Sequence, residues 1–420
     1  MAPTTPSLPP ISPLIQATLD PCVVLMKELI ARYSDNWKDK EGGIYSLAQG
    51  VVYWKPPVST TTAIQEALIA ESASDLHCYG PDEGLDALRE RLVDKIRTVN
   101  GLDDDHDVMV TAGANQAYMN CVLTLLSRND AGTTPTAVVF APYYFNHVMA
   151  LQMVVGNDNV LVGPTVEATG EPDVEWLEEQ LQSKNNTIRM VTVTNPGNPT
   201  GTTISTSTCQ RLVDLTAKHK AWMVWDCTYE DFVHTEGNDG TTCMGWNQPH
   251  CLHIFSFSKA YSLAGYRCGY VAVPTTAASG AVWNNMLKVQ DTIPIAPSRI
   301  SQYAAMGALD VGRPWIHAQV ATLAPSRKAI RAALAAPYVT NVMGGSGAMY
   351  FMAELRKKGN GVVADDQAIA EALVRDFGVA IIPGSFCGAP GWIRVCYSNL
   401  HPDQCLVAAE RLSNGLKSLC

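Results

Sequence analysis

A single lysine stands in the stretch SFSKAYSLAGYR (residues 256–267), directly after the apolar run CLHIFSFS. An ammonium group is costly to bury unless it is paired. Lys259 is therefore either an ordinary lysine at a strand end, with its amine in solvent, or a lysine held as a covalent imine. Ser256, Ser258 and Arg267 supply hydroxyl donors and a forked cation, a set that suits a phosphate monoester better than a carboxylate. The alternative for Arg267 is a surface ion pair.

Asp226 ends another strand-like run, WMVWD, and is followed by CTYEDF. A carboxylate at the end of a buried strand needs a cationic partner or several hydrogen-bond donors. That partner is either a side chain in a structural ion pair or the protonated ring nitrogen of a cofactor. Tyr229 stands three residues on and can place a phenol near the same ring. Tyr144, in APYYFNH, suits stacking on the flat face of the ring, although an aromatic residue after a strand also suits plain packing.

Three further motifs could supply groups to a binding site. The loop NPGNPTG (195–201) contains two Asn–Pro pairs that fix extended geometry, so it is a rigid loop that can also direct the Asn198 amide into a site. Arg394 lies in the apolar run GWIRVCYS and must be paired there, either in a buried salt bridge or with a substrate carboxylate. In TAGANQA, Gly113 and Ala114 open a helix after a strand, which makes either an anion site or a plain tight turn.

Six apolar runs predict the strands that position these residues: 107–111, 136–140, 190–194, 222–226, 253–256 and 270–273. They show no clean alternation, which is typical of strands buried on both faces of a sheet. Helical patterns such as 113–127 and 205–219 lie between them. The alternation predicts an α/β fold with a largely parallel sheet and helices on both faces. Ligands bind beyond the carboxyl ends of such strands, where the candidate residues stand.

Composition excludes several classes of function. The chain has 420 residues, 47% of them hydrophobic and 17% charged, which indicates a globular protein long enough for two domains. Its net charge of −10 argues against nucleic acid or an acidic membrane surface as the main partner. No apolar run is long enough to span a membrane, and the start resembles neither a signal nor a transit peptide. The 12 scattered cysteines suggest reduced thiols in a cytoplasmic protein. The nine histidines show no metal-binding spacing, so we expect no metal site.

The motifs SFSKAYSLAGYRCGY, NPGNPTG, DCTYEDF and IRVCYS, in this order, resemble those of class I/II aminotransferases of the aspartate-aminotransferase fold, which use pyridoxal 5′-phosphate (PLP). The resemblance runs from about residue 44 to the C-terminus. It implies fold-type I architecture, with a mostly parallel seven-stranded sheet between helices and a smaller α+β domain. We expect a flexible arm over 1–14, the small domain from 15–60 and 301–420, and the large PLP-binding domain over 61–300.

The resemblance also implies the catalytic roles. Lys259 would bind PLP as an imine and later carry the proton from the substrate Cα to the cofactor. Asp226 would pair with the pyridine nitrogen, so that the ring acts as an electron sink. Asn198 and Tyr229 would bond the ring oxygen, and Tyr144 would stack on the ring.

The same resemblance implies how phosphate and substrate are held in a homodimer with shared active sites. The phosphate ligands would be Ala114, Asn115, Ser256, Ser258 and Arg267, together with Tyr79 reaching across the dimer interface. The substrate would contact Arg394 through its α-carboxylate, with Gly50, Trp54 and Asn198 nearby.

The segments SLAQGVVYWKPP, YGPDEG and VQDTIPIAPSRISQ resemble a plant-type branch that acts on methionine and aromatic 2-oxo acids. The stretch VQDTIPIAP offers no arginine for a second carboxylate, although Arg299 follows it, and VVYW (51–54) offers an apolar wall beside Gly50. We therefore expect an apolar or aromatic L-amino acid donor, with methionine, tryptophan and phenylalanine as candidates, a 2-oxo acid acceptor and ping-pong kinetics. The same cofactor residues also suit a PLP-dependent C–S lyase or an ACC-synthase-like enzyme. A non-catalytic binding protein on this fold is the third interpretation.

Overall fold

A computed structural model describes residues 10–40, 42–70, 73–103, 105–126, 132–184, 186–234, 246–276, 280–357 and 361–419. Residues 1–9 of the expected arm lie outside these ranges. Just after them, Pro13–Gln16 forms helix α1, which packs against helix α6 (Phe145–Val155).

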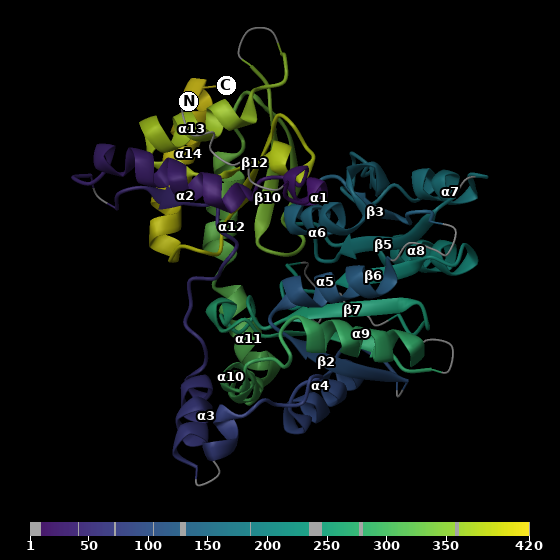
Figure 1. The fold of residues 1–420 in the computed structure, drawn as a ribbon. Helices are drawn as coiled ribbons and strands as arrows, with labels where there is room; N and C mark the ends of the chain where they lie inside the picture. Colours follow the sequence, from purple (N-terminus) through teal and green to yellow (C-terminus); the bar gives the residue numbers. More distant parts are fainter. Residues whose placement is uncertain are drawn as a thin grey trace, which may run out of the picture.

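A seven-stranded sheet forms the centre of the larger part of the molecule (Figure 1). Its order is β2 (His106–Thr111), β8 (Gly269–Pro274), β7 (Cys251–Ser256), β6 (Trp222–Asp226), β5 (Ile188–Thr194), β3 (Thr136–Phe140) and β4 (Val160–Gly163). β8 is antiparallel to both of its neighbours, and the other pairs are parallel. All six predicted strands are confirmed, and β4 is an additional edge strand.

Helices cover both faces of this sheet, as the sequence predicted. One apolar layer packs under α4 (Asp86–Thr98), α7 (Val174–Gln182) and α8 (Thr206–Lys218). The other packs under α5 (Ala114–Leu125), α6 and α9 (Gly280–Thr292). Helix α4 illustrates the pattern, because Leu88, Leu92 and Ile96 recur every four residues and are all buried. The side chains of Asp173 and Ser205 cap α7 and α8 by accepting backbone N–H groups.

A second, four-stranded antiparallel sheet has the order β12 (Ile382–Pro383), β13 (Trp392–Cys396), β10 (Tyr350–Leu355) and β9 (Val339–Gly344). The helices beside it are α12 (Ala324–Ala333), α13 (Asp366–Phe377) and α14 (Pro402–Leu419). The N-terminal segment joins this part, since α2 (Cys22–Tyr33) packs on α13 and β1 (Tyr45–Ser46) pairs with β11 (Val379–Ala380). Figure 1 shows purple α2 beside the yellow-green C-terminal helices. The domain boundaries at residues 60 and 300 stay a prediction.

Three helices lie between or beside the two sheets. α3 (Val58–Ile69) packs along α10 (Arg299–Leu309), and α11 (Gly312–Ala321) follows α10. Short 3-10 turns cover Ser34–Asn36, Ala73–His77, Asn157–Asn159, Ala264–Tyr266 and Gly384–Cys387. None of the helices in the described part of the chain combines the length and apolar character needed to cross a bilayer.

The cysteines agree only in part with the expectation of reduced thiols. Eight buried cysteines in the described ranges carry free thiols. Cys227, by contrast, is disulfide-bonded. The expected cytoplasmic location stays a prediction.

Candidate active site

A cavity of about 150 Å³ lies at the carboxyl ends of the central strands. Strands β5, β6 and β7 are parallel neighbours, so the segments that follow them meet at one edge of the sheet. The lining residues are Ala114, Asn115, Tyr144, His147, Asn198, Asp226, Thr228, Tyr229, Ser256, Ser258, Lys259, Ala264 and Arg267. The structure thus brings together ten of the predicted site residues.

Asp226 lines this cavity and is 5% exposed. Its Oδ2 lies 3.1 Å from Nε2 of His147, and its Oδ1 accepts the backbone N–H of Thr228 at 3.0 Å. Burial alone would raise the pKa of Asp226, but the hydrogen bonds from His147 and Thr228 outweigh it and hold the pKa below its ordinary value. A buried anionic carboxylate is therefore available to a cationic ring nitrogen.

His147 was not among the predicted site residues. It lies in the first turn of α6, three residues after Tyr144, and packs against Tyr118 with ring centroids 4.1 Å apart. The i, i+3 spacing from Tyr144 places both side chains on one helix face, and this was the available signal in PYYFNH.

The Lys259 amine is held inside the protein. Its Nζ donates a hydrogen bond to the carbonyl oxygen of Gly50 and lies 6.0 Å from the centroid of the Tyr229 ring. Burial is the largest cause of a lowered pKa at Lys259. Cys396 raises this pKa, and the nearby cations Arg394 and Arg267 lower it, so that the pKa is about 8. The amine is thus closer to its neutral, nucleophilic form than an exposed lysine would be at the same pH.

Other residues that line the cavity supply the donors that a phosphate group needs. Ala114 begins α5, so backbone N–H groups at that helix end are directed toward the cavity. Gly113 has φ +83°, and a Cβ there would come within 2.4 Å of Nη2 of Arg267. Arg267 is itself exposed toward the cavity, with Nη1 donating to the carbonyl oxygen of Ala264 at 2.8 Å. Helix amides, the hydroxyls of Ser256 and Ser258, and a guanidinium form a donor set that fits a phosphate monoester.

Tyr144 lies at the N-cap of α6 and lines the same cavity. Its hydroxyl accepts a hydrogen bond from Nδ2 of Asn146 at 2.9 Å and lies 3.5 Å from Oδ1 of Asn115. These contacts fix the ring beside the cavity.

Arg394 does not line the cavity and reaches it through Asn198. The guanidinium is 3% exposed; Nη1 donates to Oδ1 of Asn198 at 3.0 Å, and Nη2 donates to the carbonyl oxygen of Ala48 at 2.7 Å. Nδ2 of Asn198 in turn donates to the Tyr229 hydroxyl at 3.1 Å. Tyr350, absent from the predicted set, places its hydroxyl 2.8 Å from that of Tyr229.

Tyr79, Gly50 and Trp54 do not line the cavity within one chain. Tyr79 is 78% exposed. Gly50 contributes its carbonyl oxygen to Lys259. Trp54 packs in the core, where its indole N–H donates to the carbonyl oxygen of Ala260 at 3.2 Å and its ring stacks on Phe232. The expected apolar wall thus packs inside the protein at Trp54.

A larger cavity of about 520 Å³ shares Ser256 with the site. Lys95 and Glu230 pair with each other in its wall, and of the predicted site residues only Ser256 lines it. We therefore assign the chemistry to the smaller cavity, where charged groups face open space.

The class I and II aminotransferase family matches residues 43–412 of this chain. The chain is 39% identical over 374 residues to the aromatic aminotransferase ISS1 of Arabidopsis thaliana, covering 89% of this chain and 90% of the relative. It is 26% identical to an aspartate aminotransferase of Thermotoga maritima, covering 81% and 84% of the two chains.

Solved structures share the fold. The aspartate aminotransferase of Thermus thermophilus with maleate superposes with a TM-score of 0.81 at 23% identity, covering 97% of this chain and 100% of the other. A kynurenine aminotransferase of Pyrococcus horikoshii gives 0.81 at 21% identity, covering 97% of each chain. The expected fold is confirmed, and this chain belongs to the class I and II aminotransferases, which are PLP-dependent transaminases.

Proposed function

We propose that this enzyme moves the amino group of an apolar or aromatic L-amino acid to a 2-oxo acid by a ping-pong mechanism. One observation supports this most strongly. The buried Lys259 amine and the Asp226–His147 pair line one cavity, and Arg394 is joined to that cavity through Asn198. A pure binding protein has no need of a nucleophilic amine, a buried anion and a carboxylate-binding cation together.

Different residues around the cavity would bind the phosphate and the ring of PLP. The phosphate would be bound by the N-terminal amides of α5 at Ala114 and Asn115, by Ser256 and Ser258, and by Arg267, all of which line the cavity. Asp226 would keep a proton on the ring nitrogen, Tyr144 would cover the ring face, and Asn198 and Tyr229 would donate to the ring oxygen. When bound, PLP withdraws electrons from the substrate carbon that carries the amine. Lys259 moves the proton at that carbon, and Arg394 orients the substrate by its α-carboxylate.

The proposed substrate class depends on whether an arginine is available to bind a carboxylate in the substrate's side chain. The segment 289–297 contains no arginine. Arg299, which follows it, donates from Nη2 to the carbonyl oxygen of Tyr79 at 3.1 Å, so that part of its guanidinium is used within the fold. The relative from Arabidopsis thaliana is named for aromatic substrates. Methionine, tryptophan and phenylalanine are the candidate donors.

We propose that the two sheets close around the substrate. The large domain would extend over 61–300, and 15–60 with 301–420 would form the small domain. The support is the Arg394–Asn198 hydrogen bond, which joins β13 of the small sheet to the loop after β5 of the large sheet. A carboxylate bound by Arg394 would add a second link across the same gap and favour closure.

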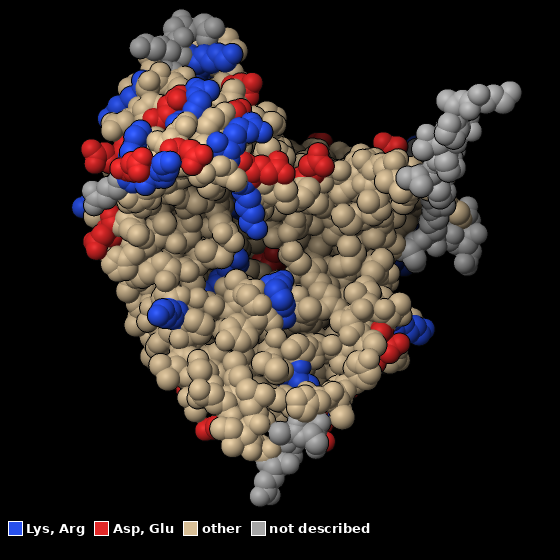
Figure 2. Space-filling view, turned by 60° about the vertical axis from the view of Figure 1, so that its left-hand side comes forward, with Lys and Arg blue, Asp and Glu red and all other residues tan. Residues whose placement is uncertain are grey.

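We also propose a homodimer in which Tyr79 reaches the phosphate of the other subunit. Figure 2 brings the α3 and α10 side of the molecule forward and shows a broad surface with few charged side chains. Exposed apolar side chains occur on α3, on α10 and in the segments beside them: Val58, Leu68, Ile69, Tyr79, Ile293, Ile295 and Ile300. Apolar surface of this extent is typical of protein–protein interfaces.

A half-reaction screen tests the proposed function. The enzyme in its PLP form is mixed with one L-amino acid at a time, and the absorbance band of the lysine-bound cofactor is followed. We expect fast loss of the band with methionine or aromatic amino acids, recovery on adding a 2-oxo acid, and no response from Lys259→Ala protein. Conversion by aspartate or glutamate alone would contradict the substrate class. Release of ammonia without the aminated cofactor would instead indicate an elimination reaction.

A further inference from the structure

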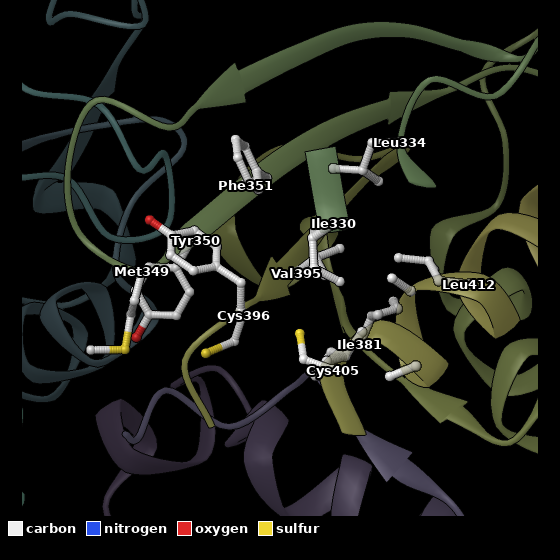
Figure 3. Close-up of a cluster of buried hydrophobic side chains, with 14 of the residues drawn as sticks. Ile330, Leu334, Met349, Tyr350, Phe351, Ile381, Val395, Cys396, Cys405 and Leu412 are labelled. Atoms are coloured by element: carbon white, nitrogen blue, oxygen red, sulfur yellow. The ribbon is translucent and has the colours of Figure 1, made fainter. Parts of the chain in front are cut away.

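Tyr350 carries a hydroxyl at the edge of the apolar core of the small sheet. It is the first residue of β10 and is 1% exposed. Figure 3 shows its ring beside the cluster that contains Ile330 and Val395, with the hydroxyl directed away from those aliphatic side chains. A buried hydroxyl needs a hydrogen-bond partner, and here the partner is the Tyr229 hydroxyl at 2.8 Å.

The direction of the neighbouring hydrogen bonds follows from Arg394. A guanidinium only donates, so the Asn198 atom 3.0 Å from Nη1 must be the carbonyl oxygen Oδ1. The other end of the amide, Nδ2, therefore faces Tyr229 and donates to its oxygen at 3.1 Å. The Tyr229 hydroxyl thus receives one proton donor already.

The remaining choice is which tyrosine donates to the other. Among the described residues, no second hydrogen-bond partner for the Tyr350 hydroxyl is found, so a Tyr350 that accepted would leave its own proton buried without an acceptor. If Tyr350 donates, its proton is satisfied, and the Tyr229 proton is free to point into the cavity. The guanidinium of Arg394 lies 4.5 Å from the centroid of the Tyr350 ring, and this positive charge favours donation by the phenol.

Gly50 keeps the space that this arrangement needs. A Cβ built on Gly50 would lie 1.9 Å from the Tyr350 hydroxyl oxygen. The Gly50 carbonyl also accepts a hydrogen bond from the Lys259 amine, so Tyr350 and Lys259 both approach this residue, which has no side chain.

We propose that Tyr350 is a positioning residue that donates to Tyr229 and thereby strengthens the hydrogen bond from Tyr229 to the ring oxygen of PLP. This inference rests on the proposed role of Tyr229. Donation into a phenol oxygen makes that phenol a better donor in turn. Donors to the ring oxygen stabilise its negative charge and weaken its hold on the proton of the Lys259–cofactor linkage. Tyr350 therefore lowers the pKa of that linkage.

A spectral pH titration of the purified holoenzyme measures this pKa without any turnover. Tyr350→Phe should raise it by about 0.3 to 1 unit, the size expected when one neutral hydrogen bond is weakened. Tyr229→Phe should raise it further. The double variant should match Tyr229→Phe alone, because Tyr350 acts only through Tyr229. Tyr397→Phe is the matched control: its hydroxyl is equally buried but bonds the carbonyl oxygen of Ala348, so the pKa should stay at the wild-type value.

The outcomes separate this inference from the function on which it rests. An unchanged pKa in Tyr350→Phe, or the same rise in the presence and absence of Tyr229, would overturn the relay. A wild-type protein that shows no absorbance band of lysine-bound PLP would instead contradict the assignment of Lys259. Circular dichroism on each variant shows whether the fold is retained.

Discussion

Replacement of Arg394 by alanine tests how the substrate is recognised. The guanidinium is buried and uses two of its five N–H groups, one on Asn198 and one on Ala48. Its Nε has no hydrogen-bond partner among the described residues. A buried cation with unused donors is suited to an incoming carboxylate, and we expect Arg394→Ala to remove that interaction.

The size of the effect follows from the burial of the group. Removing one partner of a buried, hydrogen-bonded charge pair costs about 2–5 kcal/mol. At about 1.4 kcal/mol per factor of ten, kcat/KM for an L-amino acid should fall about 30- to 4,000-fold. Arg394→Lys keeps the positive charge but loses the forked donors of the guanidinium, so the decrease in kcat/KM should be smaller than in Arg394→Ala.

The assay compares phenylalanine with 2-phenylethylamine, which has the same side chain and amine but no carboxylate. Arg394→Ala should depress the rate with phenylalanine and change the rate with the amine far less. The variant must retain PLP and its circular dichroism spectrum. An equal loss for both compounds would refute the account, because Arg394 would then act only by holding Asn198 and Tyr229 in place.

Three further predictions address the cofactor, the fold and the assembly. In the cofactor-free enzyme, capture of PLP should speed up as the pH rises through about 8, since deprotonated Lys259 is the attacking form; a rise only near pH 10 would contradict its lowered pKa. Gly50→Ala should displace Tyr350 and cost about 1–3 kcal/mol of unfolding free energy, measured by denaturant titration, and an unchanged midpoint would be inconsistent with the close contact. Tyr79→Phe and Lys259→Ala proteins, each impaired, should regain activity when mixed, because a hybrid dimer contains one intact site; no recovery after verified subunit exchange would argue against shared sites.

The central sheet was predictable because its strands are buried on both faces and end in polar residues. Runs such as 222–226 and 136–140 contain almost only apolar side chains, and their structures match the predicted bounds. β4 was missed because it is a four-residue edge strand in which only Gly163 is buried. The antiparallel direction of β8 could not be predicted from its amino-acid composition, because the pairing direction depends on how the chain returns to the sheet.

The site was predictable where chemistry follows directly from a strand end, as for Asp226 and Lys259. His147 and Tyr350 escaped prediction because their importance depends on contacts with residues 79 and 121 positions away in the chain. Trp54 was wrongly predicted to face the substrate. A large apolar side chain near a predicted pocket can equally well be buried in the hydrophobic core, as Trp54 is. Residue type alone does not distinguish these outcomes.

The most direct test of the account is to locate the cofactor on the chain. The purified enzyme is reduced with borohydride, digested, and its peptides are analysed by mass spectrometry. The account predicts that the reduced pyridoxyl phosphate is attached to Lys259, with loss of the absorbance band on reduction. Attachment to any other lysine, or a fully loaded enzyme with no labelled peptide, would contradict it.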